Sequence, residues 1–145
     1  MLFRSHLNPA VTFGLMLGDK IDLKGTIAYW IAQLAGATAA GFLALLLLGK
    51  QAVISGTPAL GKEVTVGHGV IIEAVLTFFL VFVVYGSAVD ARAPKIGGLA
   101  IGLTIALDIL FGGPLTGAAM NPARDRKSTR LNSSHIQKSR MPSSA

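Results

Sequence analysis

The residues most able to do chemistry in this chain form two identical triplets, Asn8-Pro9-Ala10 and Asn121-Pro122-Ala123. Asn is a good N-cap for a helix, and Pro suits the first helical turn because its missing N–H is not needed there. Each triplet therefore predicts a helix start. The Asn side chain at each start can donate hydrogen bonds from its amide to a passing oxygen atom. The triplets lie 113 residues apart, which indicates an internal repeat.

Two acidic residues, Glu73 and Asp108, interrupt long stretches that are otherwise uncharged. Stretches of this length are candidate membrane spans, and an unpaired charge is costly inside a membrane. Glu73 is therefore expected to face protein and to hold loop backbone near a half-helix, a helix that crosses only half the membrane. A proton relay is the competing interpretation of Glu73. Asp108 is expected to brace the loop that follows its own stretch, and facing a solute is the alternative.

Several kinds of function find no support in the sequence. The chain has no Cys, which excludes a disulfide scaffold and a Cys-ligated metal site. It shows no nucleophile and base pair, no metal-ligand cluster and no phosphate loop, so we predict neither an enzyme nor a bound metal or cofactor. Most of the net charge of +6 falls in residues 125–145, and we expect no nucleic-acid partner.

The elements that must position these residues are three apolar stretches, 25–49, 64–89 and 96–113. The chain is 52% hydrophobic and 14% charged, with a mean hydropathy of +0.61. About 20 helical residues cross a hydrocarbon core of roughly 30 Å, so each stretch predicts a spanning helix. The expected fold class is an all-α membrane protein. A soluble all-α protein is the alternative, in which uncharged runs of this length are rare.

Two shorter segments next to the triplets do not fit spanning helices. Residues 11–18 are apolar for only about half a membrane, and residues 112–117 form a Gly-rich approach to the second triplet. Together with the repeat, they indicate two half-helices. We expect a loop at residues 50–62. Tyr29 and Trp30 lie near the start of the first apolar stretch and are typical of interface anchors.

The chain resembles the aquaporin and glycerol-facilitator family, also called major intrinsic proteins. The resemblance is carried by residues 6–12 (His-Leu-Asn-Pro-Ala-Val-Thr), by Glu73, and by residues 113–124 (Gly-Pro-Leu-Thr-Gly-Ala-Ala-Met-Asn-Pro-Ala-Arg). It implies six spanning helices and two half-helices, in inverted repeats, with the half-helices meeting at the bilayer midplane. This chain would contain the first half-helix, the third to fifth spans and the opening residues of the second half-helix.

The resemblance also implies a selectivity filter of four residues. By spacing from Asn121, three of them are carried over onto Ile109, Ala118 and Arg124. The fourth would lie on the second span, which is not in this sequence. Arg124 would supply fixed donors and a charge that rejects cations. An aliphatic Ile109 beside a small Ala118 suggests a wider and less polar filter than that of water-strict members, in which His is usual at the position of Ile109. His6 is expected to satisfy backbone groups near the pore mouth.

The expected function is a passive transmembrane channel for water and small uncharged solutes. One alternative is a glycerol-selective facilitator. Another, from a different class, is an ion-coupled secondary transporter, for which only Glu73 and Asp108 could form the coupling-ion site. The implied partners are the permeating solutes, the lipid bilayer and, in the intact protein, the other subunits of a homotetramer. The expected location is the plasma membrane of a bacterium or archaeon.

Both ends of the chain resemble translated sequencing-library adapters rather than membrane protein. We therefore expect residues 1–5 and 125–145 to be adapter-derived, with the second segment a disordered tail, and residues 6–124 to form a partial channel domain. Because such a fragment lacks helices that enclose a pore, we expect the chain alone to be inactive.

Overall fold

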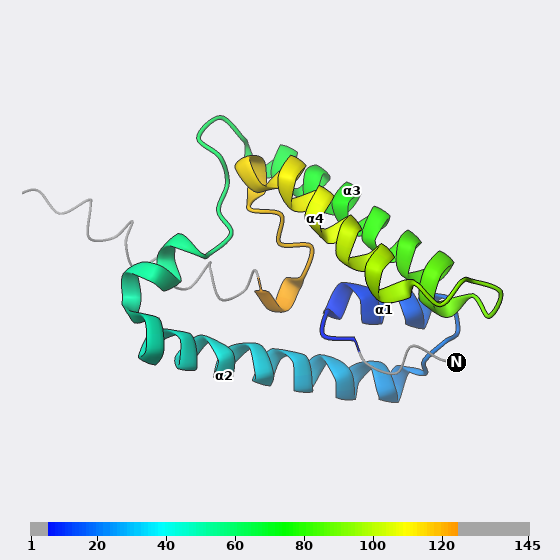
Figure 1. Cartoon of the computed structure of the whole chain (residues 1–145). Coiled ribbons are helices and arrows are strands. Elements are labelled where there is room, and N and C mark those ends of the chain that lie inside the picture. Colours follow the sequence, from blue (N-terminus) through cyan, green and yellow to red (C-terminus); the bar gives the residue numbers. More distant parts are fainter. Residues whose placement is uncertain (1–5, 125–145) are drawn as a thin grey trace, which may run out of the picture.

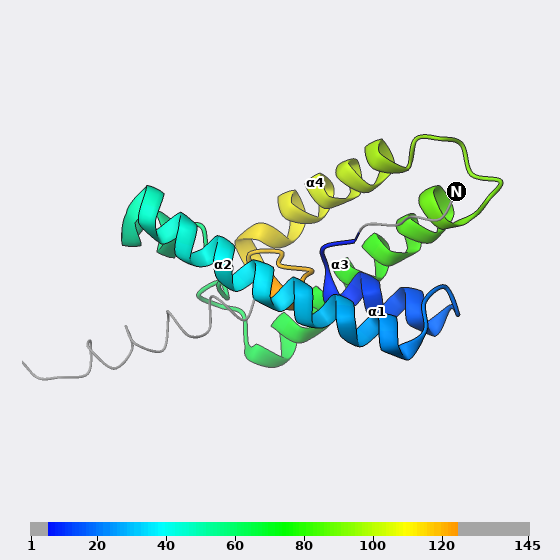
Figure 2. The ribbon, with the colours of Figure 1, turned by 90° about the horizontal axis from the view of Figure 1, so that it is seen from below.

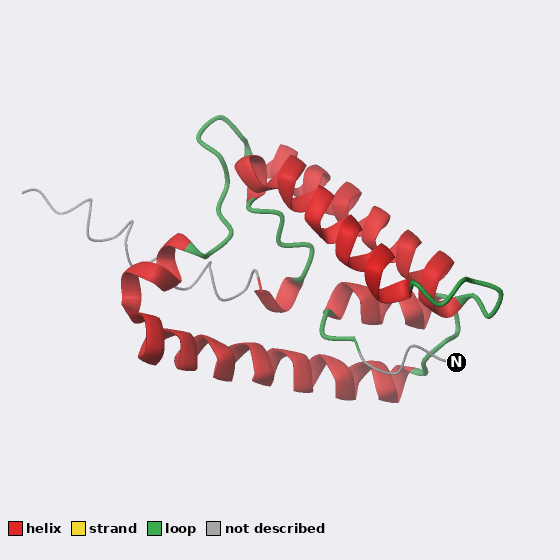
Figure 3. Cartoon of the chain, viewed as in Figure 1, coloured by secondary structure: helices red, strands yellow, loops and turns green. Residues whose placement is uncertain are grey.

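The computed structural model describes residues 6–124, so the predictions for residues 1–5 and 125–145 lie outside the described part of the chain. Its elements are the α-helices α1 (Pro9–Leu17), α2 (Leu23–Ser55), α3 (Val66–Val84) and α4 (Gly97–Thr116), with the π-helix η1 (Tyr85–Val89) continuing α3. A single helical turn follows at residues 122–124. Within the described residues there is no strand, as Figure 3 shows.

The helices are arranged around the short helix α1. Helices α3 and α4 run side by side, and α2 lies apart from them across the molecule (Figure 1). Helix α1 contacts both α2 and α3, and the view from below shows it between them (Figure 2). The small buried core lies where α1, α3 and residues 118–120 meet. The backbone before the second triplet is therefore part of the core.

Three helices are long and apolar enough to cross a membrane: Leu23–Ser55, Val66–Val89 and Gly97–Thr116. They correspond to the three stretches predicted from the sequence. Most of their large apolar side chains are exposed, including those of Phe42, Phe82 and Phe111. Exposed apolar side chains over the length of a span are suited to contact with lipid or with further transmembrane protein.

The ends of two spans differ from the prediction. Helix α2 bends at Gly49 (φ 77°) and continues to Ser55, through part of the predicted loop 50–62. Gly has no Cβ and tolerates this conformation, so the helix resumes beyond the bend. Helix α4 continues through Pro114 and ends at Thr116. The cap residue Gly117 has φ 80° and donates its N–H to the Gly113 carbonyl. Pro114 lies within the last turn, where the helix is about to end, so the lost backbone hydrogen bond does not stop it earlier.

Candidate functional site

The first triplet starts helix α1 in the predicted way. Asn8 has an extended backbone (φ −132°), and its Oδ1 accepts a 2.9 Å hydrogen bond from the N–H of Ala10. Pro9 occupies the first turn. The Asn8 carbonyl accepts the N–H of Thr12 at 3.0 Å, the first bond of the helix. The predicted helix start is therefore confirmed at Asn8.

The second triplet repeats this geometry. The Oδ1 atom of Asn121 accepts the N–H of Ala123 at 3.0 Å, and its carbonyl accepts the N–H of Arg124 at 2.9 Å. Pro122 begins the helical turn, as Pro9 does in the first triplet. Helix α1 and the helical turn at residues 122–124 thus begin with the same cap.

The two triplets also exchange hydrogen bonds. Asn8 donates from Nδ2 to the carbonyl of Met120 at 2.6 Å, and Asn121 donates from Nδ2 to the carbonyl of Leu7 at 3.2 Å. In both cases the acceptor is the residue immediately before the other Asn, so the pair obeys an approximate two-fold relation. Each amide nitrogen carries two hydrogens. The second N–H of each amide has no hydrogen-bond partner within residues 6–124.

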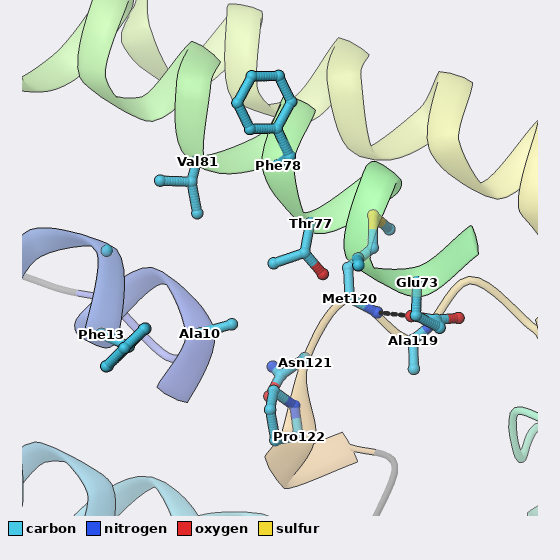
Figure 4. Close-up of a pocket in the computed structure, with 12 residues that line it drawn as sticks. Ala10, Phe13, Glu73, Thr77, Phe78, Val81, Ala119, Met120, Asn121 and Pro122 are labelled. Atoms are coloured by element: carbon cyan, nitrogen blue, oxygen red, sulfur yellow. Dashed lines mark hydrogen bonds between the residues drawn. The ribbon is translucent and has the colours of Figure 1, made fainter. Parts of the chain in front are cut away.

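Glu73 of α3 holds the backbone that leads to the second triplet. Its Oε1 atom accepts the hydroxyl of Thr116 at 2.5 Å and the N–H of Ala119 at 3.0 Å. Its Oε2 atom accepts the N–H of Met120 at 2.7 Å (Figure 4). Ala118 and Met120 have φ values of 44° and 46°, which non-glycine residues rarely adopt. Hydrogen bonds to a carboxylate are strong and offset the cost of this backbone.

Two side chains of α2 hold the first triplet in a similar way. Gln33 donates from Nε2 to the carbonyl of His6 at 2.9 Å and to the hydroxyl oxygen of Thr12 at 2.8 Å. Trp30 donates from Nε1 to the carbonyl of Pro9 at 3.1 Å. Gln33 was not among the residues predicted from the sequence. A polar residue inside an apolar span, one turn from an indole N–H donor, is the signal that could have found it.

Tyr29 and Trp30, expected as interface anchors, both contact the segment around the first triplet, and their place at a membrane interface stays a prediction. Tyr29 stacks on the imidazole of His6, with ring centroids 4.0 Å apart, and Trp30 bonds the first triplet. Through these contacts α2 supplies partners to a backbone carbonyl of α1 and to the ring of His6. His6 itself is buried and bonds from Nδ1 to the Thr12 hydroxyl at 2.7 Å.

The model of the family described as Major intrinsic protein matches residues 4–135 of the chain. The chain belongs to the major intrinsic protein family.

This major intrinsic protein is 46% identical over 126 residues to the probable aquaporin TIP3-2 of Arabidopsis thaliana, a match that covers 82% of this chain and 45% of that relative. It is 45% identical over 122 residues to aquaporin TIP2-1 of the same plant, with 82% of this chain and 48% of the relative covered. Its structure is similar to that of the aquaglyceroporin from Plasmodium falciparum, with a TM-score of 0.73, 30% identity, and coverage of 92% of this chain and 60% of that one.

These matches confirm several predictions. The major intrinsic protein is an all-α, multi-pass integral membrane protein with part of the aquaporin fold. Aquaporins are channels and not enzymes, in agreement with the prediction. The chain spans about half the length of the curated relatives that it matches.

The three expected filter residues are partly brought together in this major intrinsic protein. Arg124 forms a long hydrogen bond of 3.5 Å from Nη1 to the carbonyl of Ala118. Ala118 is fully buried, close to Gly112 of α4. Ile109 lies one helical turn before Gly112 and is exposed. No contact between Ile109 and Arg124 is described within residues 6–124, so membership of Ile109 in a constriction stays a prediction.

Asp108 is buried in α4, and its Oδ2 atom has no hydrogen-bond partner within residues 6–124. The predicted bracing contact is therefore not among the bonds that the structure describes.

Outside the spans, Arg92 bonds the exposed Asp90 at 2.8 Å. The hydrogen bond from the Arg92 side chain lowers the pKa of Asp90 to about 2, from its ordinary 3.8.

A cavity of about 500 Å³ lies beside the triplets, between α1, α3 and residues 119–122 (Figure 4). Its lining is mostly apolar and includes Phe13, Phe78 and Pro122, while Asn121 and Glu73 contribute polar groups. In the part of the chain that the structure describes, no group of three or more His, Cys, Asp or Glu side chains is placed to hold a metal ion. The polar groups of the lining can form hydrogen bonds.

Proposed function

We propose that the intact protein is a passive transmembrane channel for water and small uncharged solutes. The observation that carries this proposal is the reciprocal pair of hydrogen bonds between the two triplets, Asn8 to Met120 and Asn121 to Leu7. The pair brings two helix N-termini together and leaves an N–H of each amide for a passing oxygen atom. Membership of the family and the aquaporin relatives support the same function.

The helix starts explain how such a channel could exclude cations. Each helix N-terminus carries roughly half a positive charge, and the two meet at the triplets. Positive half-helix ends are a general explanation of cation and proton exclusion in aquaporins. The proposed outer filter consists of Arg124, Ala118 and Ile109. Arg124 supplies its positive charge, and the other two side chains leave the pore wide at this point.

A glycerol-selective facilitator is the second candidate, because the similar solved structure is that of an aquaglyceroporin. The intact protein is further proposed to be a homotetramer in the lipid bilayer. A bacterial or archaeal plasma membrane stays a prediction, since the relatives reported above are plant proteins. Residues 6–124 are proposed as the channel segment. The family match extends past both of those bounds.

The test uses a channel of full family length, here called the restored channel. It is expressed from the complete gene, or as a chimera in which residues 6–124 replace the matching segment of Arabidopsis aquaporin TIP2-1. Stopped-flow light scattering of proteoliposomes should show rapid water flux at a low activation energy. Flux should not depend on an ion gradient, and dependence on one would favour the secondary transporter. A folded restored channel without water flux would refute the proposal.

A further inference from the structure

Helix α3 and the start of η1 pack closely on the C-terminal end of α1 at two glycines, Gly14 within α1 and Gly18, which caps it. A Cβ atom at Gly14 would lie 2.8 Å from a methyl carbon of Val81, and one at Gly18 would overlap the hydroxyl oxygen of Tyr85. The glycines are four residues apart in the chain, and so are their partners Val81 and Tyr85. The matching spacing places one face of each helix against the other.

A hydrogen bond joins the two helices at this contact. The hydroxyl of Tyr85 donates to the carbonyl of Gly14 at 2.8 Å. That carbonyl also accepts the N–H of Gly18 at 3.2 Å, within the last turn of α1. The Tyr85 hydroxyl is therefore a second donor to this carbonyl, supplied by another element. Within residues 6–124, the bond from Tyr85 to Gly14 is the described hydrogen bond that joins the C-terminal end of α1 to another helix.

Tyr85 is also the first residue of the π-helix η1. The N–H of Asp90 donates to its carbonyl at 2.9 Å, a bond that spans five residues and fixes the backbone of Tyr85. Single π-helical turns are rare and are frequently found at functional sites. Here the turn presents the phenol to α1.

We propose that Tyr85 is a positioning residue for the first triplet, acting from the opposite end of α1. This inference rests on the channel function proposed above. At 1.5 Å per residue, α1 is about 13 Å long, so a change of about 5° in its direction moves one end relative to the other by about 1 Å. A shift of that size lengthens the 2.6 Å bond from Asn8 to the Met120 carbonyl beyond hydrogen-bonding distance. Tyr85 thereby sets the position of the amide that meets the solute.

The test is Tyr85→Phe in the restored channel, which removes the hydroxyl and keeps the ring. Ser87→Ala is the matched control, because Ser87 lies in the same π-helix and its hydroxyl donates to the Val83 carbonyl of its own helix. Water permeability is divided by the amount of folded channel, so a loss of folding alone does not change it. Loss of one ordinary hydrogen bond corresponds to about a fivefold change in an equilibrium. We expect Tyr85→Phe to lower permeability per channel about fivefold and to raise its activation energy, with Ser87→Ala unchanged.

A second variant decides the case in which Tyr85→Phe does not fold. Gly18→Ala keeps the hydroxyl but displaces it, and it should lower permeability per channel in the same direction. The inference is refuted if Tyr85→Phe folds and its permeability per channel is within twofold of the unmodified channel. It is also refuted if neither variant folds, because Tyr85 then serves folding only. An unmodified restored channel that conducts no water refutes the proposed function instead.

Discussion

Replacement of Glu73 by Gln tests how the second triplet is held. The carboxylate accepts three donors: the hydroxyl of Thr116 and the N–H groups of Ala119 and Met120. A Gln side chain can keep the first two at its single oxygen, but its NH₂ group then faces the N–H of Met120. A hydrogen bond to a charged group contributes about 1.5 to 3 kcal/mol, and leaving a buried N–H unsatisfied costs about 1 to 3 kcal/mol.

The expected effect is large. Residues 118–120 are either held by Glu73 or released from it. A loss of about 3 kcal/mol shifts the equilibrium between these two states by more than a hundredfold, because about 1.4 kcal/mol corresponds to tenfold. The release would also affect the Met120 carbonyl that receives the Asn8 amide. We therefore expect Glu73→Gln to reduce water permeability per folded restored channel at least tenfold.

The assay is stopped-flow light scattering of proteoliposomes, with folded channel quantified by gel filtration in detergent. Glu63→Gln is the matched control, since Glu63 is an exposed residue in the loop between α2 and α3. Thr116→Val removes one of the three donors and should have a smaller effect than Glu73→Gln. Permeability of Glu73→Gln within twofold of the unmodified channel, at equal folding, would show that the carboxylate does not hold the pore motif.

Three further predictions can be checked separately. In the restored channel, Ile109→His should exclude glycerol and still pass water, because the ring narrows the filter and adds a polar group. Unchanged glycerol flux in a folded, water-permeable variant contradicts the assignment of Ile109 to the selectivity filter. Arg92→Gln should raise the pKa of Asp90 from about 2 toward 3.8, measured by NMR titration of its carboxyl carbon. The ion pair between Asp90 and Arg92 is fully present above pH 3.8 and is lost as the pH falls through about 2. If the midpoint of the Asp90 titration does not shift in Arg92→Gln, the two residues are not paired in solution. Liposomes that contain only residues 1–145 should show no water flux above that of empty liposomes.

The spans and helix starts could be predicted from the sequence because they depend on local properties. The length of an uncharged run is enough to predict a span, and Asn8 followed by Pro9 is enough to predict a cap. The continuation of α2 past Gly49 could not be predicted in this way, because Lys50 is typical of the end of a span although a helix can extend into water. Pro114 likewise indicates a loop by its residue type, and only its place in the last turn of α4 makes it compatible with a helix.

The contacts of Gln33, Trp30 and Tyr85 could not be predicted from local properties. Each joins residues 21 or more positions apart, and the partner is a backbone carbonyl that carries no signal in the sequence. Such pairs depend on how the helices pack. Glu73 was easier to interpret, because a charge inside a span must find partners wherever the chain provides them.

The exchange of hydrogen bonds between the triplets has a consequence for biosynthesis. Asn8 and its acceptor Met120 are 112 residues apart in the chain. At about 5 to 20 residues per second, the ribosome needs roughly 6 to 22 s to make the acceptor after the donor. During that interval the tip of α1 lacks its partner, and an unsatisfied amide in lipid costs several kcal/mol. We therefore expect the first half-helix to remain in a hydrated environment until α3 and α4 have been synthesised, so that its final insertion is a late step of assembly.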